Sequence, residues 1–568
     1  MSNFILKTLE TRELKLNTIR LRGFYGGKLR KGSGGGGSSD GFPVLPGDVT
    51  RWHFGGLTNE MMAAMDDPRI EDADHKGRFL SFKNFAWKEG SGISDIYPGA
   101  LVFDGVDDWA GCDNLPLLPK EKGYSIIALR NWITRYDATQ YKRPLISNLD
   151  TNDEGAFLIE YRKDENVNDV TGSYNSFTDV YIDDNNPITW QTSSSYNGQI
   201  IKKGTSKSTN KLCICKTYFG QLSNYANAAI WEIVILDHDA TEEELTKIKD
   251  YFVKTYPWLF PDQAWTVVGK TNEDEDRATI ANITGNGNDL VLSNFGFEEG
   301  SGYGLYAYNF NSFYLKDNVV KPTDVKKDSF RIIGTGDNRN VLVLSNTSNS
   351  ADWKIRITGM KEGDRCLIGN ANKSGEYISV NKDGTYTFQK QYAATSTNGI
   401  WYNSSQEVDV LVEQIPEYEG YLVTDGVDDK ITSSIFEMGN DWTVIGDWEL
   451  INTGKNDNAG IVKFDSIVIY NYNYNSVLIN IKNGRNILIP DQNTVNAICS
   501  DGRIYSKDWK ESIYNEETES TSKNFLTIGY LGNAYTKIAF KNLAIYPTVL
   551  SREDCIKAYN YLQTLKAK

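Results

Sequence analysis

Short apolar runs, each a few positions long, recur along almost the whole chain. Examples are Leu101-Val102-Phe103, the stretch 125–129 and the stretch 442–445, and clusters of Asp, Asn, Gly and Ser separate them. Apolar runs of this length between turn-forming residues predict β-strands joined by tight turns. The pattern therefore favours an all-β chain.

Helical spacing appears at two places, after Thr241 and after Ser551, each followed at once by acidic residues. Thr241 with Glu244 has the spacing of a capping box. The apolar residues then recur every three or four positions, as Leu245, Ile248, Tyr251 and Phe252 and as Ile556, Tyr559 and Leu562. Each segment is predicted to form a short helix.

Four sequence blocks occur twice in the same order, which indicates that one domain type was duplicated. The clearest block is Asp-Gly-Val-Asp-Asp, where Asp-Gly predicts a tight turn with positive φ at glycine. The paired blocks are 56–60 with 269–273, 84–92 with 294–302, 104–108 with 425–429, and 231–235 with 541–545.

The spacing of the blocks locates an insertion in the second copy. Asn84 and Asn294 are 210 positions apart, whereas Asp104 and Asp425 are 321 apart, so 111 additional residues lie between the blocks. That surplus is enough for a small domain, and its apolar runs predict strands at 330–333, 341–344, 353–357, 385–388 and 408–412. The expected organisation is an N-terminal segment (1–40), a first module (41–262), a second module (263–311 and 417–568) and an inserted β-domain (312–416).

Composition narrows the functional classes. The 568 residues carry a net charge of −15, which argues against nucleic acid as a partner. No apolar run approaches the roughly 18 residues of a membrane span, and the N-terminus has no apolar signal-peptide core. The six Cys do not suggest a disulfide framework, and Cys213 and Cys215 are expected to face the same side of one strand.

The N-terminal segment differs from the rest of the chain. Residues 1–31 hold eight Lys and Arg against two Glu, and the Gly/Ser-rich stretch 32–39 follows as a flexible linker. A segment this short cannot bury a core of its own. It is predicted to be an anchor peptide that orders on a larger partner, through Lys15, Arg20, Arg22, Lys28, Arg30 and Lys31. The alternative is a disordered tail.

Aromatic residues are the first candidates for ligand binding. Tyr470, Tyr472 and Tyr474 alternate with Asn, so on a strand the three rings would share one face. Such a face can stack on sugar rings, and Trp109 and Trp190 are further candidates. The alternative for the Tyr residues is a cross-strand packing ladder.

Paired acids are the candidates for a metal site. Asp107 with Asp108 and Asp428 with Asp429 could supply oxygen ligands to Ca²⁺, and a plain turn is the alternative.

Glycoside hydrolysis needs two carboxylates on either side of the sugar, about 5–10 Å apart. The acidic run 273–276 lacks strand hydrophobics and is predicted to be a solvated loop. The chain is therefore expected not to be an enzyme.

The stretch Phe103–Trp109, together with Ile545-Tyr546, Ser551 and Glu553 at the end, resembles laminin-G-like and concanavalin A-like jelly-roll domains. The resemblance covers both modules and implies stacked antiparallel sheets that bind carbohydrate or protein surfaces. The fold expected is two duplicated jelly-roll sandwiches, each closing with a short helix, plus a small inserted β-sandwich and the anchor peptide.

The arrangement of anchor, linker and modules also resembles virion proteins of tailed phages of Bacteroidetes, including crAss-like phages. That resemblance implies a fibre, appendage or capsid protein located in the virion. It would attach to other virion proteins through its N-terminus and bind host-surface glycan or protein, as a homo-oligomer for which a trimer is the guess. The alternatives are a purely structural decoration protein and a bacterial protein that binds or hydrolyses polysaccharide.

Overall fold

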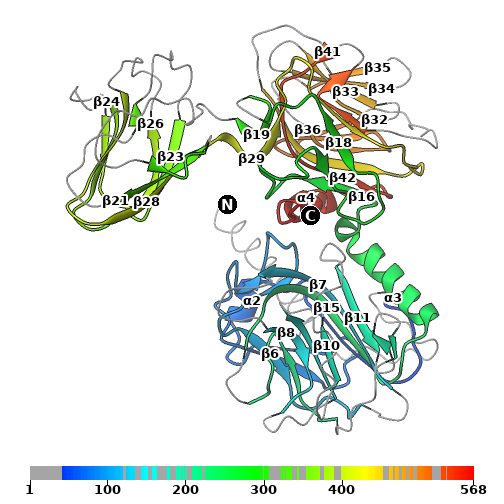
Figure 1. Cartoon of the computed structure of the whole chain (residues 1–568). Helices are drawn as coiled ribbons and strands as arrows, with labels where there is room; N and C mark the ends of the chain where they lie inside the picture. The colour runs from blue at the N-terminus through cyan, green and yellow to red at the C-terminus, as the bar shows by residue number, and fades with distance from the viewer. Residues whose placement is uncertain are drawn as a thin grey trace, which may run out of the picture.

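The chain forms two large β-sandwich modules, and a smaller β-domain extends from the second of them (Figure 1). The computed structural model describes residues 41–567 except 119–122, 135–141, 151–155, 163–174, 179–186, 193–194, 197–198, 201–207, 221–223, 298–299, 306–321, 327, 335–341, 344–352, 371–376, 389–397, 452–459, 465–466, 473–475, 482–484, 490–494, 514–525 and 532–533. The all-β fold class with two jelly-roll sandwiches is confirmed.

The first module has two sheets, here called the helix-side sheet and the far sheet. The helix-side sheet has the order β13-β12-β11-β7-β15-β5-β4, with β1 paired to β15, and the far sheet has the order β10-β9-β8-β14-β6-β3-β2. The strands are β1 (Val49–His53), β2 (Arg69–Glu71), β3 (Phe79–Lys83), β4 (Gly92–Ile93), β5 (Leu101–Asp104), β6 (Trp109–Cys112), β7 (Ser125–Thr134), β8 (Lys142–Ser147), β9 (Phe157–Arg162), β10 (Asn175–Thr178), β11 (Ile188–Thr192), β12 (Ser195–Tyr196), β13 (Gln199–Ile200), β14 (Leu212–Ile214) and β15 (Asn227–Leu236).

The second module repeats this plan. Its helix-side sheet has the order β19-β29-β42-β31-β36-β37-β38, with β16 paired to β42, and its far sheet has the order β17-β18-β30-β39-β32-β33-β34-β35. The strands are β16 (Gln263–Thr266), β17 (Thr279–Ile280), β18 (Leu290–Ser293), β19 (Gly302–Leu305), β29 (Glu417–Val423), β30 (Lys430–Ser433), β31 (Thr443–Leu450), β32 (Gly460–Phe464), β33 (Ile467–Tyr472), β34 (Ser476–Ile481), β35 (Arg485–Ile489), β36 (Val495–Cys499), β37 (Arg503–Ser506), β38 (Glu511–Ile513), β39 (Leu526–Ile528), β40 (Tyr530–Leu531), β41 (Ala534–Tyr535) and β42 (Ile538–Tyr546).

The inserted domain leaves the second module between β19 and β29, which pair with each other. The equivalent strands β4 and β5 of the first module are joined by only a short loop. The insertion therefore replaces a connection at the sheet edge and leaves the sandwich intact. Its two sheets contain β20 (Pro322–Thr323), β21 (Ser329–Gly334), β22 (Leu342–Val343), β23 (Trp353–Thr358), β24 (Arg365–Asn370), β25 (Tyr377–Val380), β26 (Gly384–Phe388), β27 (Asn398–Asn403) and β28 (Val408–Ile415).

The helices begin where the sequence predicts. In α3 (Glu242–Thr255) Thr241 and Glu244 form the expected capping box, and in α4 (Arg552–Leu562) the Ser551 side chain accepts a hydrogen bond from the Asp554 N–H. A short helix α2 (Asn59–Ala63) and a 3-10 turn η1 (Pro257–Leu259) complete the described helical elements. No helix in the described part of the chain is both long and apolar enough to span a membrane.

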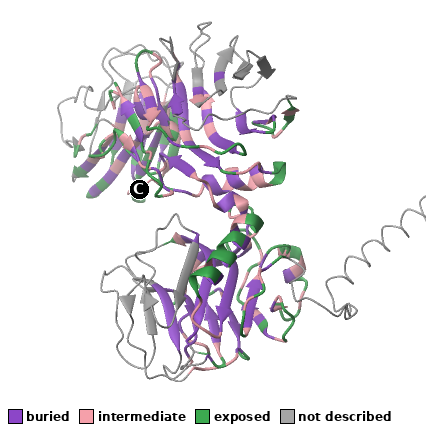
Figure 2. Ribbon diagram, turned by 90° about the vertical axis from the view of Figure 1, so that its right-hand side faces the viewer, coloured by how far each residue is buried: buried purple, intermediate pink, exposed green. Residues whose placement is uncertain are grey.

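Helix α4 lies between the two modules and α3 runs along the side of the first module (Figure 1); we call α3, η1 and α4, whose buried residues share one core, the helix layer. Both faces of the first module's helix-side sheet are covered, and strand β7 is therefore apolar on both sides. Ile126 and Ala128 face the sandwich interior, whereas Ile127 and Leu129 face the helix layer. Figure 2 shows buried positions along the strands of both modules. The outer faces of the two helix-side sheets thus share one apolar core.

Helix α4 of the second module packs directly on the first module. The Tyr561 ring meets the buried Trp231 ring edge-on at 6.1 Å. The Tyr546 hydroxyl donates to the Trp258 carbonyl at 3.0 Å, and Lys557 Nζ lies 4.4 Å from the centre of the Trp258 ring. These contacts fix the two modules relative to one another.

Candidate functional site

The duplicated pentapeptide forms the same structure in both modules, a turn that carries the chain from the helix-side sheet to the far sheet. In the first acidic turn (104–108) the chain passes from β5 to β6, and in the second (425–429) from β29 to β30. Gly105 and Gly426 both have φ of 77°. This left-handed conformation is the one that the Asp-Gly pair predicts.

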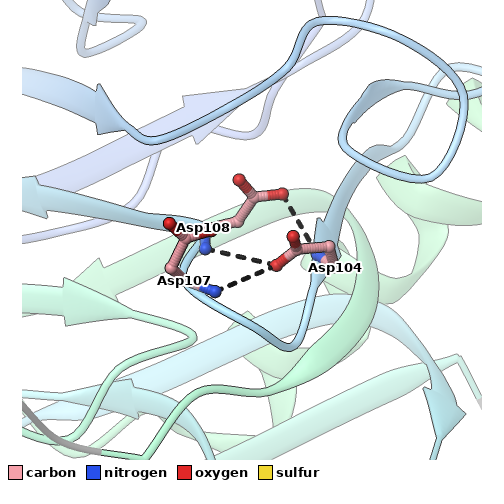
Figure 3. Close-up of side chains that lie close together, drawn as sticks. All are labelled: Asp104, Asp107 and Asp108. Carbon is pink, nitrogen blue, oxygen red and sulfur yellow. Dashed lines mark hydrogen bonds between the residues drawn. The ribbon is translucent and has the colours of Figure 1, made fainter.

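One carboxylate organises each turn (Figure 3). Asp104 Oδ1 accepts hydrogen bonds from the backbone N–H groups of Val106, Asp107 and Asp108 at 2.8, 3.2 and 3.2 Å. Asp108 Oδ2 accepts from the Asp104 N–H at 3.1 Å. The second acidic turn repeats these bonds from Asp425, Val427, Asp428 and Asp429.

The other repeated sequence blocks hold the turns in place. Asn84 Nδ2 donates to the Asp107 carbonyl at 2.9 Å, and Asn294 Nδ2 donates to the Asp428 carbonyl at 3.0 Å. Both Asn residues have φ near 70° (70° and 69°). The duplication is therefore visible in individual hydrogen bonds as well as in the strand order.

Burial changes the electrostatics of the last acid in each turn. Asp108 is fully buried and Asp429 is 1% exposed. Burial, with a smaller contribution from the neighbouring carboxylates, raises the pKa of Asp108 to about 7 and that of Asp429 to about 6. Ser301 donates to Asp429 Oδ1 at 3.1 Å. The equivalent Ser91 lies close enough to lower the pKa of Asp108, but Asp108 Oδ1 has no partner in hydrogen-bond geometry.

The three acids of each turn bring ligand atoms within 4.8 Å of one another, as a small cation would require. Ca²⁺ takes six to eight oxygens, however, and two of the three carboxylates already accept backbone N–H groups. The hydrogen bonds account for Asp104 and for one oxygen of Asp108 without a metal. A proton on Asp108 is a second way to relieve the crowded negative charge.

Replacing Asp108 by Asn is expected to flatten the dependence of stability on pH. The folded-state pKa near 7 exceeds the unfolded value near 3.9, so the wild-type carboxyl is protonated more readily when folded. The contribution of this carboxyl to stability is then greatest below about pH 4, and on the order of 4 kcal/mol of it is lost as pH rises from about 4 through 7. Asn keeps an acceptor for the Asp104 N–H without a charge. Thermal unfolding from pH 4 to 8 measures the difference.

The exposed Asp107 provides the control: Asp107→Asn removes one neighbouring charge but should keep most of the pH dependence that Asp108→Asn removes, because burial is the main cause of the raised pKa of Asp108. Added Ca²⁺ separates the two interpretations of the turn. A plain turn predicts the same unfolding temperature at pH 8 with Ca²⁺ or EDTA. An increase with Ca²⁺ that Asp108→Asn removes would instead identify a metal site.

A second cluster lies beside the first acidic turn, on the outer face of the far sheet, and we call it the Lys216 cluster. Lys216 Nζ lies 4.0 Å from the centre of the Trp109 ring and 5.8 Å from that of Tyr225. Phe219 meets Trp109 edge-on at 5.6 Å. The candidate Trp109 is therefore half-buried in a group of aromatic rings around a lysine.

Lys216 points outward because the chain changes direction before it. Cys215 has a positive φ of 57°, so Ile214 and Cys215 both face the interior and strand alternation stops. This corrects the expectation that Cys213 and Cys215 share one side, since Cys213 is not part of that interior core. The glycine at the equivalent position of the second module, Gly529, also has positive φ, at 76°.

The sequence analysis did not single out Lys216, Phe219 or Tyr225. Ala110 pairs with Ile214 in the first module, and Ile431 pairs with Ile528 at the same place in the second module. By this register, Trp109 corresponds to Lys430 and Lys216 corresponds to Tyr530. The first module therefore has an aromatic residue at the first of these positions and a lysine at the second, and the second module has them the other way round. Alignment of the two copies over these strands is the signal that could have revealed it.

The other sequence candidates are only partly described. Tyr470 and Tyr472 lie on β33, where Tyr470 pairs with Leu478, and Trp190 lies on β11 opposite Ile127. Their side chains, Tyr474 and the anchor residues Lys15, Arg20, Arg22, Lys28, Arg30 and Lys31 lie outside the described residues. The structure therefore does not test the Tyr stripe or the anchor.

A cleft of about 610 Å³ lies at the junction of the modules. It is lined by one side of α3, by the linker residues 259–262 and by Ile283, Thr284 and Asn286 of the second module. Apolar residues such as Leu245 and Phe252 line it together with the charged residues Glu242, Lys249 and Asp262.

Comparisons with known proteins do not assign this chain to a family. No family model and no curated protein matches the chain. Among solved structures, a Trypanosoma rangeli sialidase in complex with sialic acid is 8% identical, with 50% of this chain and 67% of that chain covered and a TM-score of 0.21. A structure of PNGF-II is 8% identical, with 76% and 100% covered and a TM-score of 0.11. Likenesses at these scores carry no argument about activity.

Proposed function

We propose that this protein is a non-enzymatic virion protein of a tailed phage. It attaches to other virion proteins through its basic N-terminal segment and presents two β-sandwich modules that adhere to host-surface glycan. The protein acts as a homo-oligomer, and the proposed stoichiometry is a trimer. The resemblance of the sequence to phage fibre and appendage proteins supports the virion location.

One observation carries the proposal of adhesion: the helix layer joins two equivalent modules into one unit. Individual sugar sites are weak, and linking them raises avidity through effective concentration. Rigid contacts such as Trp231 with Tyr561 and Tyr546 with Trp258 keep the two modules at a fixed separation. A repeating glycan on a cell surface is the kind of ligand that such a spacing favours.

The described acids support binding over hydrolysis. The clustered carboxylates Asp104 and Asp108, and their counterparts in the second module, are used to hold backbone N–H groups. A glycoside hydrolase needs one carboxylic acid and one carboxylate facing the sugar from two sides. The acidic turns instead place their acids together at a sheet-to-sheet crossing.

The full chain is expected to bind saturably to Bacteroidetes host cells and to a subset of glycans on an array. Binding should persist in EDTA if the acidic turns are plain turns, and loss of binding in EDTA would support Ca²⁺ there. Replacement of Tyr470, Tyr472 and Tyr474 by Ala tests the aromatic stripe. Absence of binding to cells and glycans, with attachment of the N-terminal segment to virions retained, would instead support a structural decoration protein.

A further inference from the structure

We infer that the Lys216 cluster is a subsite for the acidic group of an anionic sugar. This inference rests on the proposed function and names the class of glycan, one that bears a carboxylate or a sulfate. The sugar ring would stack on the half-exposed aromatic rings, and its acidic group would meet the Lys216 ammonium.

The first support is a buried cation without an acidic partner. Lys216 is only 5% exposed, and among the described residues no carboxylate forms an ion pair or hydrogen bond with its Nζ. Burial lowers the pKa of Lys216. Cation–π contact with Trp109 and Tyr225 offsets part of the cost of burying the charge, and an anion would offset more.

The second support is that the aromatic walls are built into the sheet. A Cβ atom at Gly111 would lie 2.6 Å from Trp109 Cζ3 and 2.9 Å from Phe219 Cε2. Only glycine at this position of β6 therefore allows the two rings to pack together over the strand. The Trp109 and Phe219 rings are held in place before any ligand arrives, which lowers the entropic cost of binding.

The third support is the charge around the rings. Lys211 Nζ lies 5.0 Å from the centre of the Phe219 ring. Arg143, which is 4% exposed, donates to the Tyr225 carbonyl at 3.1 Å. The acids of the first acidic turn are also near, and the charge of Asp107 contributes to the raised pKa of Tyr225. Asp104 and one oxygen of Asp108 are directed at backbone N–H groups, whereas Lys211 and Lys216 lie directly against the rings, so the charge at the rings themselves favours an anionic ligand.

The test uses the full chain and three variants. Lys216→Met keeps an unbranched apolar stem beneath the rings and removes the charge, whereas Lys216→Arg keeps the charge. Lys247→Met is the control, because Lys247 is an exposed lysine of α3 that pairs with Glu243 at 2.7 Å on the same helix. The probes are galacturonate oligosaccharides, their methyl esters, and a sulfated galactan with its desulfated form.

Wild type is expected to prefer at least one acidic probe over its neutral form. Lys216→Met should weaken that binding by about tenfold or more, as expected for loss of one charge-assisted bond, while Lys216→Arg and Lys247→Met retain most of it. The thermal stability of Lys216→Met should equal or exceed that of wild type, which excludes misfolding as the cause.

Several results would overturn the inference. Equal binding of acidic and neutral probes, or unchanged acidic binding by Lys216→Met, would show that Lys216 has only a packing role while leaving the adhesin proposal intact. A fall in the stability of Lys216→Met that matches its loss of binding would lead to the same conclusion. Absence of binding to any glycan or host cell would overturn both proposals.

Discussion

Replacing Glu232 by Asn is expected to lower the free energy of unfolding by about 3–5 kcal/mol. Glu232 is fully buried on β15, and its Oε1 accepts a hydrogen bond from Arg51 Nη1 at 2.9 Å. Its Oε2 accepts from the Tyr256 hydroxyl at 2.8 Å. The substitution leaves the Arg51 guanidinium buried without its counter-charge, and chemical denaturation measures the loss.

The second module supplies the control for this prediction. By strand register, Arg51 corresponds to Ala264 and Glu232 to Asn542. The double variant Arg51→Ala with Glu232→Asn recreates that uncharged pair and should be more stable than the sum of the single effects by about 2 kcal/mol or more. Additive effects in this double-mutant cycle would show that the two charges do not stabilise one another.

Replacing Tyr561 by Ala is expected to cost about 3–5 kcal/mol and to separate the unfolding of the two modules. Tyr561 is 2% exposed and belongs to α4 of the second module, yet its ring packs on Trp231 of the first. Removing the ring leaves a cavity in the shared core. Calorimetry should resolve one transition in wild type into two in the variant.

Tyr559 lies on the same helix and packs on Trp509 within the second module, with ring centres 5.7 Å apart. Tyr559→Ala should destabilise the second module without separating the transitions. If Tyr561→Ala still unfolds in a single transition at a lower temperature, the modules are coupled mainly through other contacts, such as those of η1.

The sequence was sufficient to predict the all-β class, the duplication and both closing helices. In the insertion, the five predicted apolar runs correspond to β21, β22, β23, β26 and β28. Strands β24, β25 and β27 were not predicted, because they mix Gly, Asn, Arg and Tyr with few aliphatic residues. Their burial comes from tertiary packing, which outweighs local propensity in sheets.

The acidic turns were predicted locally because the hydrogen bonds that Asp104, Asp108, Asp425 and Asp429 accept from the backbone lie within five residues. The Lys216 cluster was not, since it forms only when β6 pairs with β14, about a hundred positions later. The pairing of Arg51 with Glu232 spans an even longer range, 181 positions. The unbroken apolar run 126–129 indicated that both faces of β7 are buried, but it could not indicate that α4 supplies part of the cover.

Placement of Tyr561 against Trp231 also has a consequence for the order of events during translation. The first module is complete near Trp258, but the side chain that covers its Trp231 is made about 300 residues later. At roughly 5–20 residues per second, that delay is about 15–60 s. Throughout it the part of the apolar sheet face around Trp231 that α4 covers remains open, so we expect the ribosome-bound intermediate to depend on chaperones until α4 emerges.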